Sequence, residues 1–242
     1  VPVIAFNHSH NIKRTLKADA FFCITPYMKQ IVDAATGGNK PAFVISNAVS
    51  VPAQSELGRE GDGRFSIGAI SRLVEGKGLE TLVAALALLA QRGVDFRAVI
   101  AGEGELHAAL ERQVEAAQLG DRVAFPGWLD EAGKAAFYRS VDVVCYTSGR
   151  DVQPLTVLEA FGWGKALVGT DVLGGSSCYE DGHTALVTRV GDAAQLAAAL
   201  ERLGSDAELR DRLGRNAREQ AMRCHADAVV AGMLDRRVRE LV

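Results

Sequence analysis

The chain has 242 residues, of which 48% are hydrophobic, and its formal net charge is −3. A chain of this length can bury an ordinary globular core, and its slightly acidic balance gives no electrostatic basis for binding nucleic acid. The four cysteines are widely separated and form no Cys-x-x-Cys pair, so we expect buried free thiols and neither a metal site nor a disulfide scaffold. We find no charged leader followed by a long apolar run, and we expect a cytoplasmic protein without a membrane span.

The chain begins Val-Pro-Val-Ile-Ala-Phe, which enters directly on a strand pattern without an initiator Met. We therefore expect a fragment or a processed chain. Residues 51–63 lack apolar periodicity and have the composition of a linker. This predicts a domain boundary, with residues 1–50 on one side and residues 64–222 on the other.

Apolar strands alternate with helices from residue 64 onward, which predicts an α/β fold built on a doubly wound parallel sheet. The expected strands are Phe65–Ile70, Phe96–Ala101, Val123–Phe125, Val141–Tyr146 and Ala166–Gly169, with Leu186–Thr188 as a short sixth. Residues 79–92 carry leucines at three- and four-residue spacings, and Gly93 follows as the expected C-cap. Residues 192–222 show further apolar helical patterns, which we interpret as packing helices.

Two cations follow the first of these strands, in the segment Ser71-Arg72-Leu73-Val74-Glu75-Gly76-Lys77-Gly78. Arg72 offers a planar fork of donors and Lys77 a mobile point charge, a pair suited to neutralising a diphosphate. Taken alone, two such cations also fit a solvated surface.

The second strand is followed by Gly102-Glu103-Gly104. Because His107 stands where a dinucleotide fingerprint needs a small residue, we reject NAD binding. We expect Gly102 and Gly104 to let the backbone approach a nucleotide base or phosphate.

The segment from Asp151 to Glu159, Asp-Val-Gln-Pro-Leu-Thr-Val-Leu-Glu, places two carboxylates around the start of an apolar helix. Pro154 suits the first helical position, and Asp151 lies outside the helix near its positive end. Glu159 lies inside the helix among apolar neighbours, so its carboxylate needs a partner. The free N–H groups of the first turn suit an anion. Each acid alone also fits an ordinary surface role.

Ligands of open parallel sheets bind where the loops at the carboxyl ends of the strands converge. Arg72, Lys77, Gly102, Trp128, Asp151 and Gly175 all lie in such loops of the predicted sheet. We therefore expect the two basic and the two acidic side chains, Arg72, Lys77, Asp151 and Glu159, to meet around one hollow.

Three motifs together resemble a known family: Ser-Arg-Leu-x-x-x-Lys-Gly at 71–78, Gly-Glu-Gly-Glu at 102–105, and an acid followed after seven residues by Glu at 151–159. In this order and roughly this spacing they resemble the retaining glycosyltransferases of family four, which have the GT-B fold. The resemblance covers essentially the whole chain. Residues 64–222 resemble the C-terminal, donor-binding domain, residues 1–50 resemble the last part of the N-terminal acceptor domain, and residues 223–242 resemble a closing helix that returns toward that domain.

The resemblance implies transfer of a hexose from a nucleoside diphosphate sugar of the UDP, GDP or ADP type to a hydroxyl of a carbohydrate or glycolipid, with retention at the anomeric carbon. It implies no cofactor and no metal. Arg72, Lys77 and the helix start at Leu155 and Thr156 would stabilise the leaving diphosphate. Asp151 would hold the donor sugar, and Glu159 would hold the ribose.

Other positions match the family less directly. The loop at Trp128 and Leu129 would hold the base through its backbone, and Trp128 either stacks on the base or packs as a structural residue. Gly175 lies in a loop near the donor sugar, where this chain has serines in place of a Pro-Glu pair. His8 resembles a histidine that faces the donor sugar across the cleft, with His10 as the other candidate.

One more departure from the family pattern and two rival functions complete the sequence-based predictions. Asp151 stands where Glu is commoner, which shortens the reach of the carboxylate by about 1.5 Å. The rivals are a noncatalytic nucleotide-sugar-binding module and a sugar-nucleotide 2-epimerase.

The end of the chain carries expectations of its own. Arg236, Arg237 and Arg239 fit either contact with anionic lipid headgroups or a solvated face. With much of an N-terminal domain absent, the apolar side of residues 226–242 would be exposed or would contact another molecule, and we expect some self-association.

Overall fold

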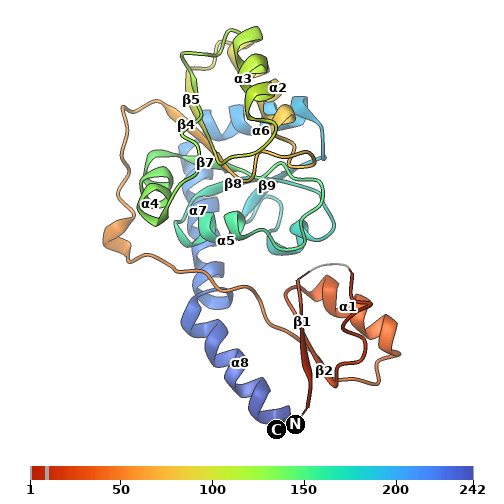
Figure 1. Ribbon diagram of the computed structural model, residues 1–242. Coiled ribbons are helices and arrows are strands. Elements are labelled where there is room, and N and C mark those ends of the chain that lie inside the picture. Colours follow the sequence, from red (N-terminus) through yellow and green to blue (C-terminus); the bar gives the residue numbers. More distant parts are fainter. Residues whose placement is uncertain (1, 9–10, 242) are drawn as a thin grey trace.

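The computed structural model describes residues 2–8 and 11–241. They form two sheets, each built of parallel strands, with helices around them (Figure 1). The smaller sheet has the order β1-β2-β3, from β1 (Ile4–Asn7), β2 (Ala20–Cys23) and β3 (Ala42–Val44). Helix α1 (Pro26–Thr36) connects β2 to β3. It begins where the Thr25 hydroxyl accepts a hydrogen bond from the Met28 N–H at 3.1 Å, and it ends at Gly37, whose φ of 64° suits glycine.

The larger sheet has six parallel strands in the order β6-β5-β4-β7-β8-β9. Its strands are β4 (Phe65–Ile70), β5 (Phe96–Ala101), β6 (Val123–Ala124), β7 (Val143–Cys145), β8 (Ala166–Thr170) and β9 (Ala185–Thr188). The chain moves outward from β4 to β6 and then returns to pair β7 with the other side of β4. The strand order therefore reverses between β4 and β7.

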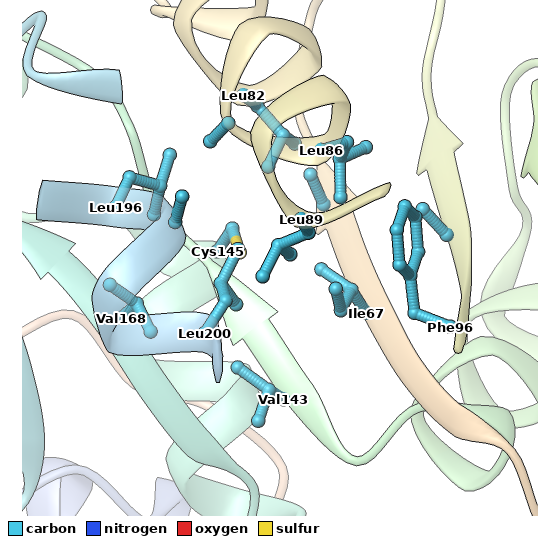
Figure 2. Packing of buried hydrophobic residues seen from close by; sticks show 14 of the residues in the cluster. Ile67, Leu82, Leu86, Leu89, Phe96, Val143, Cys145, Val168, Leu196 and Leu200 are labelled. Carbon is cyan, nitrogen blue, oxygen red and sulfur yellow. The ribbon is translucent and has the colours of Figure 1, made fainter. Parts of the chain in front are cut away.

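Helices cover both faces of the larger sheet, which confirms the doubly wound α/β fold. The helices are α2 (Leu79–Gln91), α3 (His107–Ala116), α4 (Glu131–Ser140), α5 (Leu155–Gly162), α6 (Ala193–Ser205) and α7 (Ala207–Cys224). On one face Leu82, Leu86 and Leu89 of α2 and Leu196 and Leu200 of α6 pack on Ile67, Val143 and Val168 (Figure 2). On the other face Tyr138 of α4, Phe161 of α5 and Ala217 of α7 pack on Val144 and Leu167.

The predicted elements agree closely with the observed ones. The bounds of β4 and β5 match the prediction to the residue, whereas β6 and β7 are shorter and β8 and β9 are each one residue longer. Helix α2 ends at Gln91, and Gly93 supplies the left-handed residue, with φ 76°, that follows the helix end. The division into linker and domains at residues 51 and 63 stays a prediction.

The last helix, α8 (Asp227–Leu241), runs from α7 to the smaller sheet (Figure 1). Its Val230 is buried beside Phe22 and Ile45, and Leu234, Val238 and Leu241 pack against the same cluster. The prediction of an exposed apolar side was therefore wrong, because the smaller sheet covers it. The Arg237 guanidinium lies 4.9 Å from the Phe43 ring centroid and pairs with Glu240.

Within the described residues no helix is long and apolar enough to cross a membrane. The four cysteines are free, and Cys23, Cys145 and Cys178 are buried.

Candidate functional site

A cavity of about 370 Å³ opens at the carboxyl ends of β4 and β7, where the strand order reverses. This is the position at which open α/β sheets bind ligands, because the loops on either side diverge to opposite faces. Residues after β4, residues after β7 and the first turn of α5 line it: Ser71, Arg72, Lys77, Tyr146, Thr147, Ser148, Asp151, Gln153, Pro154, Leu155 and Thr156 are among them.

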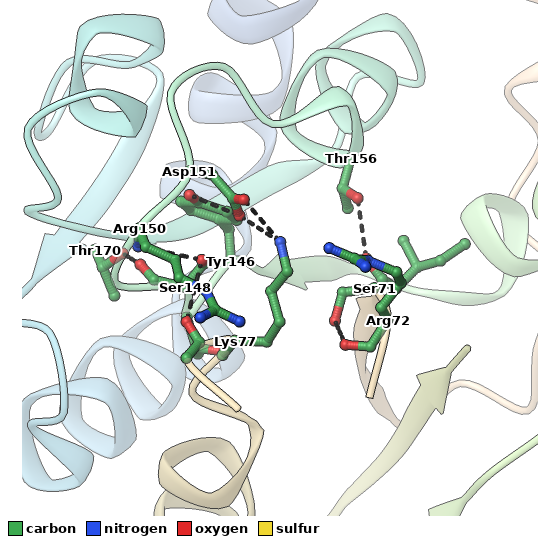
Figure 3. A network of polar contacts seen from close by, with 12 residues as sticks. Ser71, Arg72, Lys77, Tyr146, Ser148, Arg150, Asp151, Thr156 and Thr170 are labelled. Carbon is green, nitrogen blue, oxygen red and sulfur yellow. Dashed lines mark hydrogen bonds and ion pairs between the residues drawn. The ribbon is translucent and has the colours of Figure 1, made fainter. Parts of the chain in front are cut away.

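Lys77 and Asp151 form an ion pair inside this cavity (Figure 3). The Lys77 Nζ donates to both Asp151 oxygens, at 2.8 and 2.7 Å, and the Tyr146 hydroxyl donates to the same carboxylate at 3.3 Å. Burial raises the pKa of Asp151, but hydrogen bonds from Lys77 and Ser148 outweigh it, so the pKa lies below its ordinary value. Burial first, and Asp151 second, raise the pKa of Tyr146, which stays a neutral donor. The cavity therefore holds an ionised carboxylate against an ammonium.

Arg72 lines the same cavity and is exposed. It forms no ion pair with any residue that the structure describes, so its guanidinium is available to an anion. The structure thus brings Arg72, Lys77 and Asp151 together, as expected from the sequence.

The loop that carries the two cations is fixed by the loop that carries Asp151. Thr147 donates its hydroxyl to the Lys77 carbonyl at 2.8 Å, and the Gly149 N–H donates to the Gly76 carbonyl at 3.1 Å. Gly78 has φ 69°, and a Cβ there would lie 2.2 Å from the Thr147 carbonyl oxygen. Only glycine fits that close approach.

Helix α5 supplies the third wall. Pro154 precedes the helix with φ −73° and ψ 122°, and the first helical residue is Leu155. The prediction that Pro154 occupies the first helical position was wrong by one residue; the fixed φ of proline is equally compatible with this extended N-cap conformation. Thr156 donates its hydroxyl to the Ile70 carbonyl at 2.9 Å, which ties the first turn to the end of β4. Leu155 lines the cavity although half of it is exposed.

Glu159 does not line this cavity, and the prediction of a single hollow for all four charged groups was wrong for this residue. It lies one helical turn beyond Leu155, about 6 Å along the axis, in a second hollow of about 290 Å³ with Ser50, Lys134, Tyr138 and Trp163. Its carboxylate accepts hydrogen bonds from Lys134 and from the Tyr138 hydroxyl, each at 3.0 Å.

The need of Glu159 for a partner was predicted, but its partners were not. Burial raises the pKa of Tyr138 well above its ordinary value, so its hydroxyl remains a donor. Burial lowers the pKa of Lys134, but Glu159 and Glu131 together raise it by more, so the ammonium stays charged. The four-residue spacing of Lys134 and Tyr138 on α4 was the only signal in the sequence.

The glycines after β5 are explained by packing within the protein. A Cβ on Gly102 would lie 1.8 Å from the Ser71 carbonyl oxygen, and one on Gly104 would lie 2.3 Å from that of Leu73. The Leu73 N–H donates to the Glu103 carbonyl at 2.7 Å across this contact. The close approach that the structure shows is thus to the loop carrying Arg72, and an approach to a nucleotide stays a prediction.

Four more of the predicted residues, Trp128, Leu129, Gly175 and His8, do not line this cavity. Trp128 is 69% exposed, which excludes the interpretation as a packing residue, whereas Leu129 packs against the core. A Cβ on Gly175 would lie 3.0 Å from the Tyr146 hydroxyl oxygen, so Gly175 lies behind the cavity wall. His8 is exposed at the end of β1, which is directed toward the larger sheet (Figure 1), and His10 lies outside the described residues.

Sequence reasoning missed Tyr146, Ser148 and Gln153, which line the cavity. Gln153 lies inside the 151–159 motif but was given no role there, and no motif marks Tyr146 or Ser148. All three lie within eight residues of Cys145, the last residue of β7. Among residues 2–8 and 11–241, no group of three or more His, Cys, Asp or Glu side chains is placed to hold a metal ion.

Comparisons with known proteins extend this description. The sequence model of the family described as Glycosyl transferases group 1 matches residues 53–220. The chain is 33% identical over 156 residues to an alpha-D-kanosaminyltransferase of Streptomyces kanamyceticus, which covers 64% of this chain and 40% of that protein. It is 30% identical over 206 residues to the lipopolysaccharide core biosynthesis glycosyltransferase LpsE of Rhizobium meliloti, covering 83% of this chain and 58% of LpsE. The chain thus spans about half the length of these relatives.

Solved structures show the same fold at low sequence identity. HepE of Anabaena in complex with UDP superposes with a TM-score of 0.84 at 19% identity, covering 99% of this chain and 72% of HepE. Sucrose-phosphate synthase of Thermosynechococcus elongatus gives a TM-score of 0.83 at 20% identity, with 98% of this chain and 67% of that chain covered.

Proposed function

The chain belongs to the glycosyl transferases group 1, and from this premise we propose that its cavity binds the diphosphate and the sugar of a nucleoside diphosphate sugar. The donor hexose is then transferred to a hydroxyl of a carbohydrate or glycolipid acceptor with retention at the anomeric carbon. The observation that carries the proposal is the placement of Arg72, Lys77 and Asp151 in one cavity where the strand order reverses. HepE, which shares the fold, was crystallised with UDP and glucose, which supports a donor of the UDP type; GDP and ADP donors fit the same chemistry.

The residues take complementary roles in this proposal. Arg72, Lys77 and the first-turn N–H groups at Leu155 and Thr156 stabilise the negative charge that grows on the leaving diphosphate. Lys77 exchanges its contact with Asp151 for the diphosphate, and the released carboxylate accepts hydrogen bonds from the donor sugar. Because Asp151 is already ionised, it can accept these bonds without first losing a proton.

The outer residues hold the rest of the donor. Glu159, oriented by Lys134 and Tyr138, binds the ribose hydroxyls, and Trp128 and Leu129 contact the base. Gly102 and Gly104 shape the loop beneath the diphosphate, Gly175 supports the wall behind the sugar, and His8 faces the sugar from the smaller sheet. We assign residues 1–50 to the acceptor side, 51–63 to a linker, 64–222 to donor binding and 223–242 to the returning helix. The four free cysteines fit the reducing cytoplasm.

Isothermal titration calorimetry with UDP, GDP and ADP tests the donor site. We expect saturable, weak binding of one of the three, and its loss when Arg72→Met and Lys77→Met are combined. An absence of heat with all three nucleotides at millimolar concentration would contradict the proposal.

Product analysis separates the proposed activity from its rivals. Release of the nucleoside diphosphate from a bound nucleotide sugar supports transfer. Conversion of the donor into an epimeric nucleotide sugar would instead identify a 2-epimerase. Because this chain spans about half the length of its relatives, binding with little or no turnover is what we expect of it, and this outcome is shared by a binding module.

A further inference from the structure

Three consecutive residues between β7 and α5 contact three different parts of the molecule. Asp151 pairs with Lys77, which lies in the loop of residues 71–78 between β4 and α2, called the cation loop below. Val152 is buried, with 8% of its surface exposed, in the core of the smaller sheet beside Phe21 and Met28. The side chain of Gln153 forms hydrogen bonds with residues that directly follow β2 and β3 of the smaller sheet. The segment that carries the cavity carboxylate is therefore also part of the contact between the sheets.

Gln153 uses its whole amide in that contact. Its Nε2 donates to the Ile24 carbonyl at 2.8 Å and to the Ser46 hydroxyl oxygen at 3.1 Å, and its Oε1 accepts from the Asn47 N–H at 2.8 Å. An amide supplies two N–H donors and an acceptor oxygen, whereas Glu only accepts and Lys only donates. The geometry therefore requires an amide of this length.

The atoms that Gln153 contacts are themselves held in place. The Ser46 hydroxyl oxygen lies 2.6 Å from the Nδ1 of His225, a buried residue between α7 and α8. The Val49 N–H donates to the His225 carbonyl at 2.9 Å, and Val49 bridges to Ala226. Gln153 thus bonds to the segment by which the chain leaves the smaller sheet, and this segment also contacts the start of α8.

We propose that Gln153 is a positioning residue: it holds the Asp151–Gln153 segment to the smaller sheet, so that the place of the cavity carboxylate depends on how the two sheets are docked. The part of this inference that concerns the donor sugar rests on the function proposed above. The part that concerns the docking of the sheets does not.

The docking part is tested by pulsed electron paramagnetic resonance on spin labels attached at Ala34→Cys in α1 and Ala109→Cys in α3, both exposed positions. Cys224→Ser is included throughout, and the three other cysteines are buried. Gln153→Met, which keeps the length and loses the hydrogen bonds, should broaden or shift the distance distribution. The matched control is Gln220→Met. Among the residues that the structure describes, the side chain of half-buried Gln220 bonds to the Cys178 carbonyl alone, at 2.7 Å, and both residues belong to the part of the chain built on the larger sheet. An unchanged distribution in Gln153→Met would overturn the inference.

The sugar part is tested by calorimetry with UDP against UDP-glucose, GDP against GDP-mannose and ADP against ADP-glucose. In the pair that the unmodified protein binds, Gln153→Met should leave the affinity for the nucleoside diphosphate within about twofold. It should reduce the additional affinity that the sugar contributes by on the order of fivefold. A general loss of folding would weaken both ligands alike, so an equal loss for both would contradict a positioning role, as would an unchanged ratio. If the unmodified protein binds no pair, the proposed function fails, and the distance measurement alone decides the docking claim.

Discussion

Lys77 is neutralised by Asp151 before any ligand arrives, and this shapes what the cavity can do. An ammonium that is 14% exposed and paired with a carboxylate loses part of its attraction for an anion. In the proposed function a diphosphate offers more charge than Asp151 and also meets Arg72, so we expect the exchange of partners to be favourable. The ion pair keeps both side chains in place until the ligand enters.

Replacement of Lys77 tests this exchange. Lys77→Met removes a charged hydrogen bond to the diphosphate, and we expect the affinity for the nucleoside diphosphate to fall by on the order of tenfold or more. Calorimetry measures the change. Lys29→Met is the control, because Lys29 also pairs with an aspartate, Asp33, but does so on α1 of the smaller sheet and does not line the cavity. Equal losses in the two variants would contradict a role of Lys77 in binding.

Glu159 permits a second test at this scale, because Lys134 also contacts Glu131. If Glu159 binds the ribose, UDP should bind about fivefold more tightly than 2′,3′-dideoxyuridine diphosphate, and Glu159→Gln should largely abolish that preference. Glu131→Gln should retain it, since Glu131 is 93% exposed at 3.2 Å from the same Lys134. A preference that survives in Glu159→Gln would remove the ribose from this hollow. GDP or ADP replaces UDP where the protein binds it instead.

At the scale of elements, the cation loop is a rigid part of the fold. It is packed against the loop after β5 on one side and the loop after β7 on the other, with glycines at both contacts. These contacts therefore fix the backbone from which Arg72 and Lys77 extend.

Gly102→Ala tests this packing. The glycine has φ 127°, and an added Cβ would overlap the Ser71 carbonyl oxygen, so we expect the free energy of unfolding to fall by about 2 kcal/mol or more. Urea denaturation measures it. Gly120→Ala is the control, because nothing lies within 4 Å of a Cβ there. Unfolding midpoints that coincide in the two variants would show that the contact is not tight.

Much of this arrangement was predictable from the sequence. The bounds of β4 and β5 were, because each is a mostly apolar segment that lies between a charged residue on one side and a serine or glycine on the other. The cation loop and Asp151 follow from the rule that loops at the carboxyl ends of parallel strands converge. The partners of Glu159 and the contacts of Gln153 were not predictable, since single polar side chains far apart in the sequence carry no periodic signal. Glu159 was misplaced because it lies one helical turn beyond Leu155, which puts its carboxylate in the second hollow.

At the scale of the whole molecule, the two sheets are joined by a small polar centre next to α8. The buried His225 contacts Ser46, which in turn contacts Gln153. Burial lowers the pKa of His225 from 6.5 to about 4. The folded protein therefore holds this imidazole neutral where the unfolded chain would protonate it.

This predicts a dependence of stability on pH. Between pH 6.5 and about 4 the unfolded chain binds a proton that the folded protein does not, so stability falls as the pH falls through this window. The full stability is present above pH 6.5, and on the order of 3 kcal/mol of the free energy of unfolding is lost once the pH falls below about 4. His225→Gln should flatten the dependence in urea denaturation, whereas His107→Gln, at the half-buried first residue of α3, should not. A slope that persists in His225→Gln would assign it to other groups.

The central claim is that the cavity between β4 and β7 holds the diphosphate and sugar of the donor. A crystal structure with a bound nucleoside diphosphate sugar tests it most directly. We predict diphosphate oxygens within hydrogen-bond distance of Arg72 and Lys77, and a sugar hydroxyl on Asp151 in place of the Lys77 ammonium. A nucleotide sugar bound elsewhere, with the Lys77–Asp151 pair intact, would contradict the account.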